Sequence, residues 1–364
     1  NNVVVDVSKC NFCMDCISPC PTGSIDTWRV VAEPYTLEQQ FEMVELPELE
    51  EGLDEGSDGG GSLEALEDEI EALLAKAHEG TGGKPVAPVS ASKPSINLFN
   101  RAKPARAVVQ GNFRLTDADA ESDVRHIILN LGEQVFPVLE GQSIGVVVPG
   151  EDADGRPHEP RLYSIASARD GEKPNTNNIA LTVKREDRGV ASNYLCDLEK
   201  GAEIDITGPF GATFLLPNDP QANLIMICTG TGSAPFRGFT ERRRRTMPQL
   251  KNKLKLYFGA RRPEELPYFG PLKKVPESLM HTEYCYSRVE GEPKEYVQDR
   301  MRQRAPELLE LLQKDETHIY ICGLKGMETG VDEALADICR NGGLDWASLK
   351  PDMRTSGRYH VETY

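Results

Sequence analysis

The sequence predicts an antiparallel β barrel followed by an α/β domain with a parallel sheet. Residues 96–217 carry short β-rich runs separated by turns rich in Gly, Pro and Asp, a pattern typical of a barrel or sandwich. Residues 218–364 alternate apolar strand-like runs with helical stretches, which indicates an open parallel sheet covered by helices. Two further segments precede these domains, a cysteine-rich one at 1–32 and an acidic one at 33–95.

The first segment holds four closely spaced cysteines, Cys10, Cys13, Cys16 and Cys20, followed by Pro21. The spacing C-x2-C-x2-C-x3-C-P is the bacterial ferredoxin run for a 4Fe–4S cluster, because short loops let successive thiolates reach corners of one cubane. A zinc knuckle or a disulfide cluster is the alternative, but zinc sites usually pair two separated C-x2-C elements. The four cysteines are therefore the candidate metal ligands.

This cysteine run is half of a two-cluster pattern. In two-cluster ferredoxins the fourth cysteine ligates the other cluster, and the sequence holds no second run of three cysteines. Because the first residue, Asn1, is also not methionine, we expect a truncated, partial ferredoxin-like segment. A single cluster that uses Cys20 locally is the less favoured alternative.

The acidic segment carries most of the net charge of −17. Residues 33–80 include sixteen acidic residues and one lysine, which is typical of a solvated linker. Apolar residues recur at helical spacing over about 62–79, with Ser62 as N-cap and Gly80 at the end. We expect this amphipathic helix to pack on a neighbouring domain or, less favoured, to dock a partner. Residues 84–94, rich in Pro and Ser, are predicted to form a spacer.

Composition excludes several function classes. A hydrophobic content of 39% and a charged content of 27% are ordinary for a globular protein, and no apolar run has the length of a membrane span. The negative net charge disfavours nucleic-acid binding. The five other cysteines lack the spacing of a disulfide framework, which favours a reducing compartment, so we expect a cytoplasmic protein that uses no membrane.

Within the two domains, apolar runs bounded by turn residues predict the strands, and longer amphipathic runs predict the helices. The barrel strands are expected at Val124–Leu131, Ser143–Val148, Ile179–Lys184 and Glu203–Thr207. The strands of the parallel sheet are expected at Leu224–Thr229, Lys253–Ala260, Met280–Ser287 and His318–Cys322. The helices are expected at Phe236–Arg245, at Tyr296–Gln303 continuing through Leu312, and at Met327–Arg340.

Three short motifs carry the chemistry. A strand runs into Gly-Thr-Gly-Ser-Ala-Pro at 230–235 before a helix, and such a turn lets backbone amides approach a pyrophosphate where ligands bind in these folds. A second anion-binding helix start is expected at 189–192. Arg161, Tyr163 and Ser164 on one strand supply a charge, a stacking ring and a hydroxyl, although each alone could be structural.

In this order the motifs resemble those of the plant-type ferredoxin–NADP reductase family over residues 96–364. The matching segments are RLYS at 161–164, GVASNYL at 189–195, GPFG at 208–211, GTGSAPFR at 230–237 and ICGLKGME at 321–328. The resemblance implies an FAD-dependent NADPH oxidoreductase with FAD on the barrel and NADP on the α/β domain. It implies that FAD contacts Arg161, Leu162, Tyr163, Ser164, Val183, Lys184, Gly189, Val190, Ala191, Ser192 and Tyr364. It implies that NADP contacts Thr231, Gly232, Ser233, Pro235, Ser287, Arg288, Lys294, Tyr296, Gly323, Leu324 and Glu328.

Charge supports NADPH rather than NADH. The 2′-phosphate of NADPH requires cations and hydroxyl donors, and Ser287, Arg288, Lys294 and Tyr296 supply them after a predicted strand. An acidic residue at position 287 would have indicated NADH. A solvated loop that happens to be basic is the structural alternative.

The resemblance also implies four catalytic residues, Ser164, Cys322, Glu362 and Tyr364. The C-terminal aromatic, Tyr364, would stack on the flavin and move before nicotinamide can take its place. Cys322 would support the geometry of hydride transfer, and Glu362 would act with Ser164 in proton delivery or positioning. A chain that ends on an aromatic would otherwise carry no meaning, because termini fray.

The tandem of ferredoxin segment, acidic linker and reductase resembles the reductase components that serve a benzoyl-CoA epoxidase. This resemblance implies NADPH, FAD and iron–sulfur clusters as cofactors and a terminal oxygenase as partner. Two alternatives stay open. One is a reductase for a separate soluble ferredoxin or flavodoxin, and the other is a redox sensor or scaffold that binds nucleotide without turnover.

Overall fold

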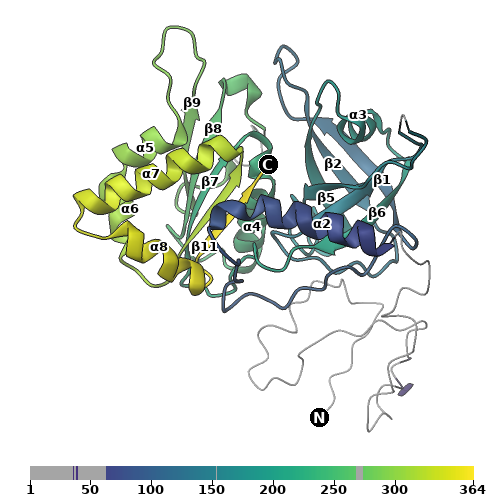
Figure 1. Ribbon diagram of the computed structural model, residues 1–364, viewed down its shortest axis with the longest axis horizontal. Helices are drawn as coiled ribbons and strands as arrows, with labels where there is room; N and C mark the ends of the chain where they lie inside the picture. Colours follow the sequence, from purple (N-terminus) through teal and green to yellow (C-terminus); the bar gives the residue numbers. More distant parts are fainter. Residues whose placement is uncertain (1–35, 37, 40–62, 153, 268–273) are drawn as a thin grey trace.

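The computed structural model describes the chain at residues 36, 38–39, 63–152, 154–267 and 274–364 (Figure 1). The predicted ferredoxin-like segment, with Cys10, Cys13, Cys16 and Cys20, lies outside the described residues. The rest forms a six-stranded antiparallel sheet and a five-stranded parallel sheet, which confirms the predicted fold class. No helix in these ranges is both long and apolar enough to cross a membrane.

The antiparallel sheet has the strand order β4-β3-β6-β1-β2-β5. Its two edge strands meet through a bridge between Ile165 and Leu181, which closes the sheet into a barrel. Alternate side chains of each strand point inward, and helix α3 fills one end of this core with Leu195. The elements are β1 Ala105–Arg114, β2 Val124–Asn130, β3 Ser143–Val147, β4 Arg161–Ser164, β5 Asn178–Lys184, α3 Val190–Asp197 and β6 Glu203–Phe210.

The parallel sheet has the order β11-β10-β7-β8-β9, so the carboxyl ends of all five strands share one edge. Its strands are β7 Asn223–Thr229, β8 Leu254–Ala260, β9 Met280–Tyr286, β10 Thr317–Gly323 and β11 Tyr359–Thr363. Its helices are η2 Gly230–Ser233, α4 Ala234–Thr246, η3 Pro263–Glu265, α5 Val297–Gln303, α6 Ala305–Leu312, α7 Lys325–Asn341 and α8 Trp346–Thr355.

Both faces of the parallel sheet are buried. On β7, Met226 packs with α4 on one face, whereas Ile225 and Ile227 pack with α5, α7 and α8 on the other. This two-sided burial explains the nearly continuous apolar run of the strand. The predicted helix over 296–312 is in fact two helices, because the chain turns at Arg304 and Pro306 starts a new first turn.

Helix α4 joins the two domains. Arg237 donates to the carbonyl oxygen of Ala166 at 2.9 Å and to Glu172 at 2.8 Å, and Arg245 pairs with Asp170 at 2.8 Å. Burial opposes ionisation of Glu172, yet the neighbouring His126 and Arg237 lower its pKa to about 2. The barrel loop and the helix are therefore held together by buried and partly buried charges of opposite sign.

The predicted linker helix is present as α2, Leu63–Ala77, and a short turn, η1 Glu79–Thr81, follows it. Both lie across the C-terminal strand β11 between the two domains (Figure 1), as the packing option predicted. The prediction of a spacer at 84–94 is wrong. Ser92 is 3% exposed and accepts a hydrogen bond from Arg169, and Ala87 and Ala91 pack against Leu139 and Leu215.

Candidate active site

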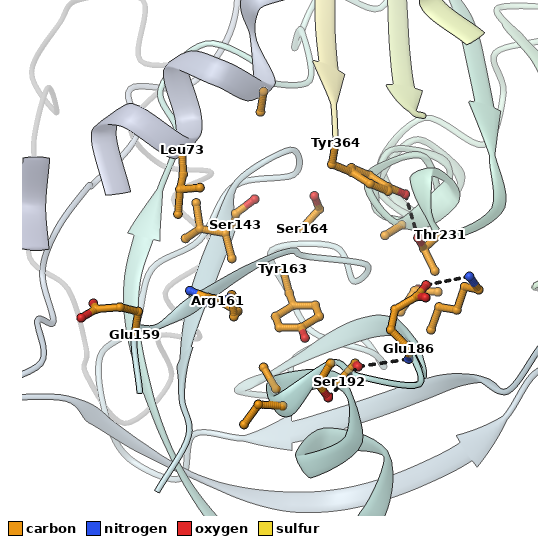
Figure 2. A pocket seen from close by; sticks show the side chains of 18 of the residues that line it. Leu73, Ser143, Glu159, Arg161, Tyr163, Ser164, Glu186, Ser192, Thr231 and Tyr364 are labelled. Atoms are coloured by element: carbon orange, nitrogen blue, oxygen red, sulfur yellow. Dashed lines mark hydrogen bonds and ion pairs between the residues drawn. The ribbon is translucent and has the colours of Figure 1, made fainter. Parts of the chain in front are cut away.

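A cavity of about 610 Å³ lies between the barrel, the parallel sheet and α2. Strand β4 and the start of α3 line one side, Thr231 and the C-terminal residues line another, and α2 adds Leu73, Leu74 and Ala77. Figure 2 shows Tyr163 and Ser164 facing this space, with Leu73 and Tyr364 on opposite sides. A cavity of this size and mixed polarity has the dimensions of a cofactor pocket.

The structure brings together ten of the eleven residues predicted to bind FAD. Arg161, Leu162, Tyr163, Ser164, Lys184, Gly189, Val190, Ala191, Ser192 and Tyr364 all line the cavity. Val183 does not, because strand side chains alternate and Val183 packs in the barrel core at 1% exposure. Its neighbour Thr182 lines the cavity instead.

The start of α3 has the geometry expected of an anion-binding helix N-terminus. Its N-cap is Gly189, which has no side chain to hydrogen-bond the first backbone amides of the helix. These amides can therefore bind an anion. A Cβ at Gly189 would lie 2.3 Å from Ser192 Oγ and 3.1 Å from Glu186 Cβ, so the turn is tightly packed around this glycine. The Ser192 hydroxyl accepts from Glu186 N and donates to the Gly189 carbonyl, both at 3.1 Å. Ser192 therefore shapes the turn in this structure.

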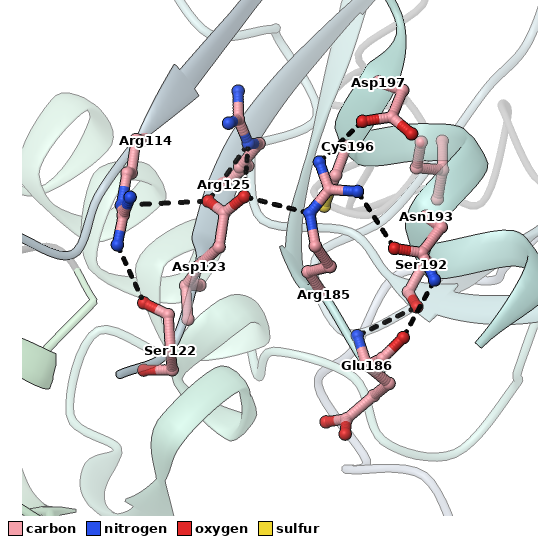
Figure 3. Close-up of polar contacts among 12 residues, drawn as sticks. Arg114, Ser122, Asp123, Arg125, Arg185, Glu186, Ser192, Asn193, Cys196 and Asp197 are labelled. Carbon is pink, nitrogen blue, oxygen red and sulfur yellow. Dashed lines mark hydrogen bonds and ion pairs between the residues drawn. The ribbon is translucent and has the colours of Figure 1, made fainter. Parts of the chain in front are cut away.

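One arginine anchors α3 to the barrel (Figure 3). Arg185 donates to Asp123 at 3.1 Å, to Asn193 at 2.9 Å and to Asp197 at 2.7 Å. Asp123 is partly buried, which opposes its ionisation, but hydrogen bonds from Arg185 and Arg125 lower its pKa. Arg185 thus attaches α3, the helix that would bind the pyrophosphate, to strands β2 and β5.

We expect Arg185→Met to weaken FAD binding by about tenfold, because α3 would lose the two charge-assisted contacts that attach it, through Arg185, to the barrel. FAD release followed by fluorescence at neutral pH measures this. Arg106→Met is the control, since Arg106 pairs with Asp205 and Glu203 on the exposed barrel surface. Equal FAD affinity in the two variants would contradict the anchoring role.

The predicted NADP contacts gather at the carboxyl edge of the parallel sheet. Thr231, Gly323 and Leu324 follow the neighbouring strands β7 and β10, and Ser287 and Arg288 follow β9. Lys294 is exposed, and Tyr296 is the N-cap of α5 at 46% exposure. Ser233 and Pro235 are buried, and Ser233 Oγ donates to the Gly230 carbonyl at 2.9 Å, so both shape the turn. Glu328 accepts from Thr363 Oγ1 at 3.1 Å.

Three predicted catalytic residues meet at the end of β10 and β11. Tyr364 Oη and Thr231 Oγ1 are 2.7 Å apart, and Tyr364 N donates to the Gly323 carbonyl at 3.0 Å. Cys322 pairs in register with Glu362. Burial, with the Glu362 charge adding, raises the pKa of the Cys322 thiol, so it is not a thiolate nucleophile at neutral pH. The fourth residue, Ser164, lies opposite Ser143 on β3.

The site fits an FAD and a pyridine nucleotide. A planar aromatic, Tyr163, lines the cavity beside an open helix start and the cation Arg161. Burial raises the pKa of Tyr163 to about 12, so its ring stays neutral and can stack. Glu362 Oε2 is buried and has no hydrogen-bond partner among the described residues, as expected of a group that faces an absent ligand.

Comparison with known proteins decides the family. Residues 113–214 match the model of the oxidoreductase FAD-binding domain, and residues 226–333 match that of the oxidoreductase NAD-binding domain. The ferredoxin–NADP reductase of Thermosynechococcus vestitus is 39% identical over 316 residues, which cover 80% of this chain and 82% of the relative. The chain belongs to the plant-type ferredoxin–NADP reductase family.

Other members of the family agree over the same region. The leaf-type chloroplast ferredoxin–NADP reductase of Nicotiana tabacum is 39% identical over 289 residues, 74% of this chain and 79% of the relative. The solved ferredoxin–NADP⁺ reductase of Plasmodium falciparum is 26% identical with a TM-score of 0.58 and covers 74% of this chain and 99% of its own. This reductase is therefore an FAD-dependent oxidoreductase of NADP(H).

Sequence reasoning missed the part of the reductase site that the linker supplies. Three residues of α2 line the cavity, Leu73, Leu74 and Ala77. Their helical spacing predicted that the helix packs on a domain, but not that it borders the cavity. Ser143 and Arg188 also line the cavity. Arg188 directly precedes the Gly189 turn and could have been found by its charge beside an anion-binding helix start.

Proposed function

We propose that this reductase takes electrons from NADPH and delivers them singly, through an iron–sulfur centre at Cys10, Cys13, Cys16 and Cys20, to a partner oxygenase. The observation that supports this route is the wall that α2 contributes to the FAD cavity. Helix α2 begins at Leu63, so in the chain it follows the acidic and cysteine-rich segments, and its second half lines the cavity. We propose benzoyl-CoA epoxidase as the oxygenase, on the resemblance of the tandem.

The chain's own residues would bind and orient the two nucleotides. Bound FAD would supply the chemistry, taking a hydride and releasing electrons one at a time. Tyr163 and Tyr364 would stack on its ring, and the start of α3 would hold its pyrophosphate. Glu362 and Ser164 would hold a proton beside the ring, and α2 would exclude water from one side of the cavity.

A preference for NADPH follows from the charges at the sheet edge. Arg288 and Lys294 are exposed near Ser287 and supply the cations that a 2′-phosphate requires. A variant of the Plasmodium falciparum reductase, 25% identical with a TM-score of 0.58, has been solved in complex with 2′P-AMP. This relative supports a 2′-phosphate site on the same fold.

A second candidate function is the reduction of a separate soluble ferredoxin. The names of the relatives favour it, since they are ferredoxin–NADP reductases. The two candidates differ in whether the chain's own cysteines are needed. A cytoplasmic location stays a prediction, supported by the five free, buried cysteines of the described residues.

The double variant Cys13→Ser/Cys16→Ser separates the two candidates. We expect it to lose iron and acid-labile sulfide and to lower benzoyl-CoA-dependent NADPH oxidation with the epoxidase by more than about 100-fold, because two cluster ligands are gone. Reduction of ferricyanide, which can accept electrons directly from flavin, should stay within about twofold of the parent. Ser18→Ala, in the same segment, is the control.

Undiminished electron delivery by the double variant would reject the fused route. Undiminished delivery to an added soluble ferredoxin, together with inactivity toward the epoxidase in the parent protein, would favour the second candidate. A parent protein without ferricyanide reductase activity would exclude both.

A further inference from the structure

Helix α2 covers one side of the cavity with apolar side chains. The residues that do so, Leu73, Leu74 and Ala77, share one face of the helix. Leu73 is 37% exposed, and Figure 2 shows its side chain pointing into the space that it lines. A cofactor bound in the cavity would cover this apolar surface, and such burial is favourable.

The cations of the cavity come from the barrel. Arg161 lies on β4, Lys184 ends β5, and Arg188 directly precedes α3. Lys184 also pairs with Glu186 at 2.6 Å. These cations and the start of α3 suit a pyrophosphate, whereas the described α2 residues that line the cavity are all apolar. The helix therefore complements the ring systems of FAD rather than its phosphates.

The C-terminal end of α2 is fastened to the α/β domain. His78 directly follows the helix and donates from Nδ1 to the carbonyl oxygen of Val361 on β11 at 2.8 Å. Glu79 pairs with Lys325 of α7 at 2.9 Å, and Thr81 is 1% exposed. The turn η1 therefore has a fixed place against β11 and the start of α7.

The body of the helix has no comparable attachment. Within the described part of the chain, no hydrogen bond or ion pair joins residues 70–77 to the barrel. A helix of 15 residues is marginal alone in water, so α2 depends on burial of its apolar face. It is thus held at one end by polar contacts and over the cavity by apolar ones (Figure 1).

We propose that α2 is a lid of the FAD site: Leu73 and Leu74 pack on the bound cofactor, and FAD leaves only when the helix rotates away from the cavity about η1. The inference deepens the proposed function and rests on it for the place of FAD in this cavity. The family models match residues 113–214 and 226–333, so α2 lies before both of them. A segment outside the matched domains thereby retains the cofactor during turnover.

A lid of this kind acts on release more than on association. Its contacts with FAD exist only in the closed state, so their loss speeds dissociation and leaves the encounter with the open cavity unchanged. Each leucine is already partly covered by the protein, so its truncation removes only part of the burial of a full side chain. We expect about fivefold in the release rate for each leucine, or about 25-fold together.

Leu73→Ala/Leu74→Ala in the full-length FAD-bound protein tests the lid. Alanine is the best helix former, so the variant preserves α2 itself. Release is followed by the change in flavin fluorescence after addition of an excess of a flavin-binding apoprotein. It should be about 25-fold faster than in the parent, whereas the association rate of added FAD should stay within about twofold.

Glu71→Ala/Lys76→Ala is the matched control. Both side chains are exposed on the same helix, and neither lines the cavity. The two carry opposite charges, so the net charge is unchanged, and the variant again truncates two long side chains to alanine. Its FAD release should stay within about twofold of the parent.

Amide hydrogen exchange reports the motion of the helix. FAD cannot leave before the lid opens, so the opening rate of residues 70–77 in the parent should equal or exceed the release rate when opening limits exchange. In Leu73→Ala/Leu74→Ala, exchange of residues 70–77 should be about tenfold faster. Helix α8 is the internal reference and should stay parental, because it packs on the parallel sheet and lines no part of the cavity.

Parental FAD release in Leu73→Ala/Leu74→Ala would overturn the lid, and so would an equal acceleration in Glu71→Ala/Lys76→Ala. Release that is faster than the opening of residues 70–77 would overturn it as well. These measurements require no NADPH, no iron and no partner protein. A failed fused route would therefore leave this test intact.

Discussion

Tyr364→Ser is expected to tighten NADP⁺ binding by about 30-fold and to slow turnover by a similar factor. The ring borders the cavity, and its hydroxyl is 2.7 Å from Thr231 Oγ1. If the ring stacks on bound FAD, as we propose, nicotinamide would have to displace both the stacked ring and this hydrogen bond. Stacking contributes about 1 kcal/mol and the hydrogen bond about another, and together they amount to about 2 kcal/mol, or about 30-fold in affinity. Serine removes this competition, and product release becomes slow.

Titration of flavin absorbance with NADP⁺ measures the affinity, and stopped-flow with steady-state NADPH oxidation measures release. Tyr364→Phe keeps the ring and loses the Thr231 contact, so it should tighten NADP⁺ binding by only about fivefold. Unchanged NADP⁺ affinity in Tyr364→Ser would reject the gate.

Gly232→Ala is expected to lower NADPH oxidation by about 100-fold or more with FAD content unchanged. A Cβ at Gly232 would lie 2.2 Å from the carbonyl oxygen of Cys322 and 2.9 Å from Gly323 Cα, and these backbone atoms cannot rotate away. The turn would have to separate from β10 by roughly an ångström, and displacements of this size lower rates by about a hundredfold.

Gly326→Ala is the matched control, because Gly326 lies on α7 at the same sheet edge and a Cβ there meets nothing within 4 Å. It should retain parental kcat and KM, and the ratio of FAD to protein from the absorbance spectrum should be equal in both variants. Parental NADPH oxidation in Gly232→Ala would show that the turn does not need this close approach.

The sequence predicted the elements whose pattern is local. Strand β7 is an almost continuous apolar run because both of its faces are buried, and the Gly230 turn follows it directly. The resemblance predicted Val183 as a cofactor contact, but the alternation of side chains along β5 places it in the barrel core. Period two alone would have selected Thr182 and Lys184.

What the sequence could not predict depends on distant partners. Ser92 stands in no periodic run of apolar residues, and its buried hydroxyl accepts a hydrogen bond from Arg169, 77 positions away in the chain. His78 is one residue in an acidic helix end, and its partner Val361 is 283 positions away. Each of these contacts joins one polar atom to one other, so it produces no periodic pattern that could be recognised in the sequence.

The order of synthesis gives the contact between η1 and β11 a further meaning. Domains tend to fold N-terminal first as the chain emerges from the ribosome. The barrel and α2 can therefore form before the strand that holds the hydrogen-bond acceptor of His78 has been made. His78 binds the carbonyl oxygen of Val361, on the strand that also pairs with β10. The site is therefore complete only after β11 has been translated, because that strand carries both the Val361 carbonyl and Glu362, which lines the cavity.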